Sequence, residues 1–164
     1  MVKPLHCAFA LVIGLTGCNT LSTAQTANIA KMTDCEKVIA LVENAKDKFR
    51  PLKGSKVNTP FLTSWYAKYH LVGEQCQISE YSTGITGYHC ETSFDALSVA
   101  KDTYTTSKSM LSKCLNESWG LITTTKSTIF THPSEPLIVH LSVAETLNQH
   151  SPWQVKLEIM PDDE

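Results

Sequence analysis

This sequence of 164 residues lacks several features that mark common protein classes. None of its apolar runs approaches the roughly 20 residues that a transmembrane helix needs. No continuous run of Lys or Arg occurs, and the formal net charge is −2. Because nucleic-acid binders carry a basic patch on a basic chain, this balance excludes a nucleic acid as the expected partner. It also gives no electrostatic reason for attraction to anionic lipid head groups.

Catalytic and metal-binding motifs are missing as well. The sequence contains no G-x-S-x-G and no Gly-rich phosphate loop, which are the patterns typical of Ser hydrolases and nucleotide-binding proteins. It has neither the helical metal spacing H-E-x-x-H nor a C-x-x-C pair. We therefore predict no catalytic residue, no metal and no cofactor.

The most specific motif in the chain lies near its beginning. Lys3 precedes the apolar run Ala8 to Gly14, which is followed by Leu15-Thr16-Gly17-Cys18. This arrangement resembles the lipobox of bacterial lipoproteins. The resemblance implies that the Cys18 thiol receives a diacylglyceryl group, that the chain is cut before Cys18, and that the new amine is acylated. The alternatives are an ordinary secretory signal cut after Ser22-Thr23-Ala24 and an uncleaved signal anchor.

This resemblance predicts how the chain is divided into segments and where in the cell it is located. Residues 1–17 form the signal peptide, residues 18–31 a lipidated N-terminus and flexible tether, residues 32–160 one domain, and residues 161–164 an acidic tail. By the enterobacterial sorting rule, Asn19 after the cysteine implies the outer membrane, facing the periplasm. The predicted membrane contact is the lipid anchor, because several acyl chains hold a protein far more firmly than one.

Four cysteines remain once Cys7 leaves with the signal and Cys18 takes the lipid: Cys35, Cys76, Cys90 and Cys114. In an exported chain this even number indicates two disulfides, for which three connectivities exist; a metal site is the alternative. A hairpin centred on Thr83 places Cys76 opposite Cys90, within disulfide reach. Cys35 then pairs with Cys114, at the start and the end of two antiparallel helices.

Periodicity predicts two helices and six strands. A capping box at Thr33 and Glu36 begins the first helix, which ends before Pro51, and the second helix begins near Asp95. Alternating patterns predict strands at 61–71, 75–81, 88–92, 120–132, 137–143 and 153–159. The order α-β-β-β-α-β-β-β favours an α+β fold: an antiparallel sheet of about six strands with both helices packed on one face. Two three-stranded layers, or another strand order, fit the same pattern.

The helix-free face of this sheet is the candidate binding face. Alternation assigns to it the polar side chains of Tyr66, Lys68, His70, His89, Glu91 and His140. The plainer interpretation is a solvated polar surface, since alternation by itself requires polar residues there.

Two hypotheses for function follow. The first is a non-catalytic module, tethered to the cell envelope, that binds another envelope protein as an assembly factor, inhibitor or immunity-type protein. The alternative is a small-ligand-binding protein or envelope enzyme that uses the open face around Tyr66, His70 and His89. This alternative predicts a concave pocket of about 300 Å³ or more.

Overall fold

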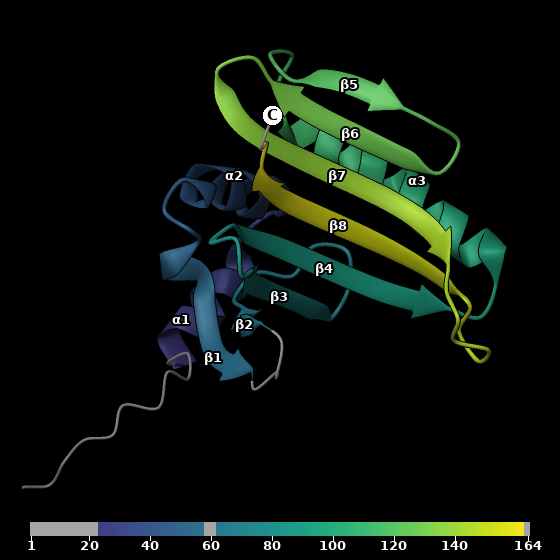
Figure 1. The fold of residues 1–164 in the computed structure, drawn as a ribbon, viewed down its shortest axis with the longest axis horizontal. Coiled ribbons are helices and arrows are strands. Elements are labelled where there is room, and N and C mark those ends of the chain that lie inside the picture. Colours follow the sequence, from purple (N-terminus) through teal and green to yellow (C-terminus); the bar gives the residue numbers. More distant parts are fainter. Residues whose placement is uncertain (1–22, 58–61, 163–164) are drawn as a thin grey trace, which may run out of the picture.

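Eight antiparallel strands form one sheet in the computed structural model, which describes residues 23–57 and 62–162. The strand order is β1-β2-β3-β4-β8-β7-β6-β5 (Figure 1). The strands are β1 (Lys53–Val57), β2 (Thr63–Ala67), β3 (Gln75–Glu80), β4 (Thr86–Phe94), β5 (Gly120–Thr123), β6 (Ser127–His132), β7 (Glu135–Glu145) and β8 (Trp153–Pro161). The helices are α1 (Thr23–Lys31), α2 (Asp34–Ala45) and α3 (Leu97–Cys114), with a short 3₁₀ turn η1 (Arg50–Leu52).

The predicted mixed α+β class with an antiparallel sheet is confirmed, but the expected six strands and two helices are corrected to eight strands and three helices. Strand β1 lies in a region expected to be a loop, and the expected strand over 120–132 is a hairpin of β5 and β6. Its turn contains no Gly or Pro: the hydroxyl of Thr124 accepts hydrogen bonds from the backbone N–H groups of Lys126 and Ser127. Because Gly and Pro are absent, the sequence over 120–132 did not indicate a turn between two strands.

After α1, the described elements form two halves with a similar order. Helix α2 precedes β1 to β4, and α3 precedes β5 to β8. The last strands of the two halves, β4 and β8, pair in the middle of the sheet, and each half extends outward from there. The sequence order indicated two similar halves, and the strand order shows how they join.

The residues before the domain differ in part from the expected tether. Residues 23–31 form helix α1, whose side chains from 25 to 31 are exposed apart from half-buried Ile29. The signal peptide, Cys18 and the strand residue Phe61 lie outside the described residues. At the other end β8 includes Pro161, the first residue of the expected tail, and residues 163–164 are likewise outside the described part.

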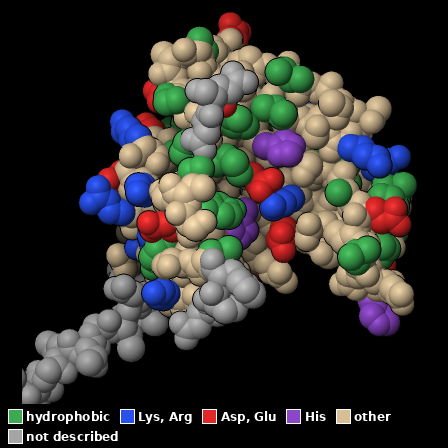
Figure 2. Space-filling model, viewed as in Figure 1, with side chains coloured by type: hydrophobic (Ala, Val, Ile, Leu, Met, Phe, Trp, Pro, Cys, Tyr) green, Lys and Arg blue, Asp and Glu red, His purple; other side chains and the backbone are tan. Residues whose placement is uncertain are grey.

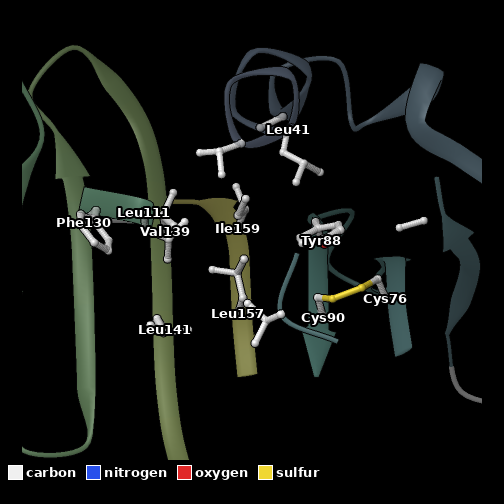
Figure 3. Close-up of a cluster of buried hydrophobic side chains, with 14 of the residues drawn as sticks. Leu41, Cys76, Tyr88, Cys90, Leu111, Phe130, Val139, Leu141, Leu157 and Ile159 are labelled. Carbon is white, nitrogen blue, oxygen red and sulfur yellow. A yellow bond between two sulfur atoms is a disulfide. The ribbon is translucent and has the colours of Figure 1, made fainter. Parts of the chain in front are cut away.

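Helix α2 begins at the predicted capping box. The backbone N–H of Thr33 donates to Glu36 Oε2 at 2.6 Å, and that of Glu36 donates to Thr33 Oγ1 at 3.3 Å. The helix buries Val38, Leu41 and Ala45, whereas Ile39 is 45% exposed. The buried stripe therefore passes through Leu41, which Figure 3 shows above the strands that carry Ile159 and Tyr88.

Helix α3 begins two residues later than expected. Its N-cap is Ala96, and the carboxylate of Asp95 accepts a hydrogen bond from the Ser151 hydroxyl at 2.8 Å instead of capping the helix. Val99, in the first turn of the helix, is 49% exposed. The helix is held by the burial of Ala100, Tyr104, Ser107 and Leu111.

Both long helices pack on the same face of the sheet. Helix α2 contacts β4 and β8, and α3 contacts β4, β7 and β8. Alternate residues of the strands are apolar and face these helices. Buried residues of β7 lie opposite apolar residues of β8 in the pairs Leu137–Pro161, Val139–Ile159, Leu141–Leu157 and Val143–Val155. Full burial of one such side chain stabilises the fold by about 1.5–3 kcal/mol. This core leaves the other side of the sheet, here called the open face, without a helix from the described residues.

Both disulfides have the expected connectivity. Cys76 lies directly opposite Cys90 in the β3–β4 hairpin, and Cys35 at the start of α2 is bonded to Cys114 at the end of α3. The first disulfide closes a short hairpin, while the second spans a sequence separation of 79 residues. Together they tie the two helices to each other and two neighbouring strands of the sheet to each other.

Candidate functional site

The open face carries one row of side chains that crosses seven strands. Direct cross-strand pairs connect its members in the order Tyr66, Gln77, His89, Glu158, His140, Ile129 and Ile122, here called the central row. Directly opposed residues of antiparallel strands point to the same side, with Cβ atoms about 4.5–5.5 Å apart. Figure 2 views this face and shows His, acidic and Lys side chains gathered near its middle.

An ion-pair network occupies the centre of the row. Glu158 Oε1 lies 2.6 Å from Lys156 Nζ on the same strand, and Glu158 Oε2 lies 3.5 Å from His140 Nδ1 on β7. The Glu158 side chain is only 17% exposed. The pKa of Glu158 is lowered to about 2: the hydrogen bond from His140 is the largest cause, partial burial acts in the opposite direction, and Lys156 adds to the lowering. Glu158 is therefore a fixed anion whose two oxygens are already engaged.

His89 lies directly opposite Glu158 on β4 and is half-buried. Burial lowers its pKa, the charge of Lys156 lowers it further, and the carboxylates of Glu91 and Glu158 raise it. The imidazole is therefore neutral at pH 7, with one nitrogen able to donate and the other to accept a hydrogen bond.

A hollow of about 300 Å³ opens beside His89. Two buried hydroxyls, Ser64 Oγ and Ser79 Oγ, lie 2.9 Å apart among its lining residues. The full lining is Leu62, Ser64, Gln77, Ser79, Tyr81, His89, Glu91 and Lys156. The ligand-binding alternative predicted a pocket of this size, but the residues expected with His89, namely Tyr66 and His70, do not line it.

Four of the six residues predicted for the binding face share the open face: Tyr66, His89, Glu91 and His140. Tyr66 is 54% exposed at one end of the central row. Glu91 is the next residue after His89 on the same face of β4, and it lies directly opposite Lys156.

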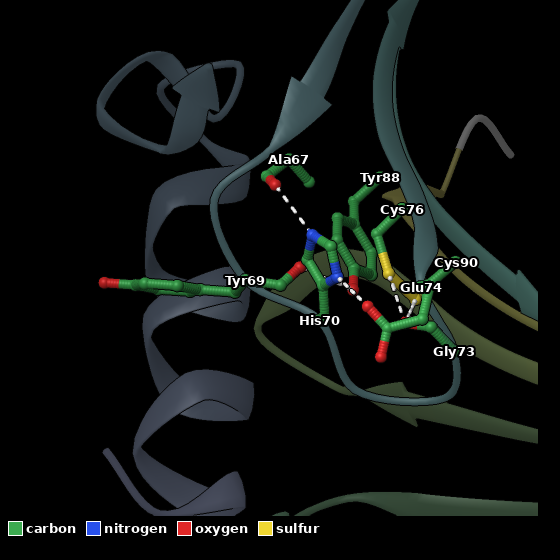
Figure 4. Close-up of a disulfide and its surroundings, with 8 residues drawn as sticks. All are labelled: Ala67, Tyr69, His70, Gly73, Glu74, Cys76, Tyr88 and Cys90. Atoms are coloured by element: carbon green, nitrogen blue, oxygen red, sulfur yellow. Dashed lines mark hydrogen bonds and ion pairs between the residues drawn. A yellow bond between two sulfur atoms is a disulfide. The ribbon is translucent and has the colours of Figure 1, made fainter. Parts of the chain in front are cut away.

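The expected positions of Lys68 and His70 on the open face are wrong. Strand β2 ends at Ala67, so the expected alternation to residue 71 does not continue. Lys68 Nζ donates to the Pro51 carbonyl at 2.9 Å, beside β1. His70 Nε2 lies 3.2 Å from the Ala67 carbonyl and Nδ1 lies 3.4 Å from Glu74 Oε2 (Figure 4). These contacts hold His70 in the loop between β2 and β3, beside the Cys76–Cys90 disulfide, and not in the central row.

Sequence reasoning missed Glu158 and Lys156 as members of the site. The alternation along 153–159 placed both on a polar strand face, which was the available signal. What it did not indicate was that β8 lies between β4 and β7, so that Glu158 meets His89 on one side and His140 on the other.

Residues 23–57 and 62–162 contain no group of three or more His, Cys, Asp or Glu side chains placed to hold a metal ion. Within the same residues, no helix is both long and apolar enough to cross a membrane. Comparison of the chain with protein-family models, with curated proteins and with solved structures finds no match.

Proposed function

We propose that this chain is a lipid-anchored interaction module of a bacterial cell envelope, which binds another envelope protein through its open face. The observation that carries the proposal is the central row: it is free of helices from the described residues and has an exposed aromatic residue, Tyr66, at one end and Ile122, 60% exposed, at the other. Aromatic anchors beside hydrogen-bonding groups are typical of protein interfaces.

The size of the face suits a protein partner. Six inter-strand spacings of about 4.8 Å make the central row about 29 Å long. A standard interface buries about 800 Å² on each partner, which corresponds to a patch about 32 Å across. The internal pairing of Glu158 favours a partner that adds hydrogen bonds and apolar contacts, because the carboxylate needs no external cation.

Cys18 carries the anchoring part of the proposal, with the outer membrane, facing the periplasm, as the proposed location. Helix α1 supports a separated domain, since its side chains from 25 to 31 are exposed apart from half-buried Ile29, and none of them belongs to the hydrophobic core. We expect Cys18→Ala to abolish acyl labelling of the chain and to release it from the membrane fraction. Unchanged membrane retention would contradict the anchor.

The partner is best found by site-specific photo-crosslinking in the native envelope. A photoreactive residue at Tyr66 should give one discrete adduct, because this side chain lies in the proposed interface. The matched control is Val99, which is 49% exposed on the outer side of α3. Tyr66→Ala should weaken binding of the identified partner, whereas Val99→Ala should not. Equal adducts from both positions, or none from Tyr66, would contradict the proposal.

The second candidate, a small-ligand-binding protein or envelope enzyme, is favoured by the hollow beside His89. The hydroxyl, amide and imidazole groups among its lining residues suit a small molecule that forms hydrogen bonds. If this candidate holds, a ligand should shift the NMR resonances of the His89 imidazole, and Gln77→Ala should weaken that effect. A protein adduct at Tyr66 with unchanged His89 resonances would favour the first candidate.

A further inference from the structure

A cavity of about 540 Å³ opens on the helix side, at the end of the core. It lies between the last turns of α2, the turn before β4, the start of β7 and the end of β8. Its apolar wall includes Val42, Ala45, Ile85 and Leu137, of which Leu137 faces the helices directly opposite Pro161. This volume is within the range of small-molecule sites.

One of the residues that line this cavity, Thr86, carries a buried polar atom with no partner among the described residues. Thr86 is 2% exposed, and its Oγ1 has no hydrogen-bond partner among the described residues. Thr86 has the same parity on β4 as Tyr88, so it faces the helices and not the open face. A buried hydroxyl without a partner is costly, and native structures rarely keep one without a reason.

Two lysines are among the lining residues of the same cavity. Lys46 and Lys48 line the cavity, and Lys48 Nζ donates to the carbonyl of Gly84, two residues before Thr86, at 3.3 Å. Burial lowers the pKa of Lys53, Glu80 raises it, and the charges of Lys48 and Arg50 lower it further, which shows that these cations share one region. Glu135 is the one carboxylate among the lining residues.

The backbone that presents Lys48 is in an uncommon conformation. Lys48 and Phe49 have φ angles of 52° and 54°, in the left-handed region that residues other than Gly rarely adopt. Phe49 is fully buried and anchors this segment in the core. Such conformations cost free energy and tend to occur where the placement of a side chain matters.

We propose that this cavity binds an amphiphile with a single alkyl chain and a carboxylate head group. The head group lies between Lys48 and the hydroxyl of Thr86, which donates to it, and the chain lies along Val42, Ala45 and Leu137. The site is on the opposite side of the sheet from the open face, and the inference does not rest on the proposed function.

The test is calorimetric titration of the purified chain with sodium dodecanoate below its micellar concentration. We expect saturable binding at one site and no comparable binding of dodecyltrimethylammonium, which has the same chain with a cationic head. Thr86→Val keeps the shape of the side chain and should weaken dodecanoate binding about tenfold, as expected for loss of a hydrogen bond to a charged group. Lys48→Met should have a similar effect, while the matched control Lys56→Met, on β1 and outside the lining, should have none.

Thermal unfolding of the free protein separates this role from a structural one. Thr86→Val removes an unpaired buried hydroxyl and should raise the Tm while it weakens binding. A raised Tm with unchanged dodecanoate affinity would overturn the inference, as would the absence of saturable binding or equal binding of the cationic probe.

Discussion

The ionised carboxylate of Glu158 should be a measurable source of stability, and Glu158→Gln tests this. A pKa of about 2 in the folded state, against about 4.3 in the unfolded chain, corresponds to about 3 kcal/mol at pH 7. Its partners Lys156 and His140 are 34% and 32% exposed, so solvent screens part of the interaction. We therefore expect Glu158→Gln to lower the free energy of unfolding by about 2 kcal/mol at pH 7.

The sign of the pH dependence follows from the lowered pKa. The stabilisation is complete above about pH 5, where the carboxylate is ionised in both the folded and the unfolded state. It is lost as the pH falls toward 2, where the folded state also takes up a proton. Urea unfolding followed by Trp fluorescence, at pH 7, 5, 4, 3 and 2, should show the wild type and Glu158→Gln converging across the acid part of this range.

Glu91→Gln is the matched control, because Glu91 lies opposite Lys156 on the same face but makes no ion pair within 4.0 Å in the described part of the chain. We expect it to change stability by less than about 0.5 kcal/mol. A difference between wild type and Glu158→Gln that is the same at pH 2 and pH 7 would refute the reasoning, since it would show that the ionised form is not what stabilises the fold.

Two further predictions concern stability and self-association. Replacing Cys35 and Cys114 by Ser should lower the free energy of unfolding by about 4.5 kcal/mol, and the same change at Cys76 and Cys90 should lower it by about 3 kcal/mol, because the longer loop restricts the unfolded chain more. Denaturant unfolding without reductant measures both values, and the reverse order would contradict the loop argument. Edge strand β5 has no charged residue and exposes 60% of Ile122; since uncharged edges pair with other chains, Ile122→Lys should reduce concentration-dependent association in sedimentation experiments, and unchanged association would argue against this edge.

Features with a local cause could be predicted from the sequence. The capping box needs only Thr33 and Glu36 three residues apart, and it begins α2 as expected. The register that sets Cys76 opposite Cys90 follows from the centre of one hairpin. Both α2 and α3 are present, and the expected disulfide between Cys35 and Cys114 joins the start of one to the end of the other.

Two failures show where local patterns are insufficient. Strand β1 contains Lys53, Gly54 and Lys56 and has no clean alternation; it is a strand because its backbone pairs with β2 at the sheet edge, across a register shift. His70 continued an alternating pattern, yet the loop contacts with Ala67 and Glu74 took it off the open face.

The sequence by itself determined which side of each well-patterned strand is apolar, because side chains alternate with a period of two whatever the neighbours are. Beyond the β3–β4 hairpin, the tertiary structure alone decided the order of the strands in the sheet. Pairing of β8 with β4 and β7 has no local signature, since it joins residues about 70 and about 20 positions apart through the burial of a shared core. That pairing brings Glu158 between His89 and His140, and with it turns three separate polar residues into one candidate site.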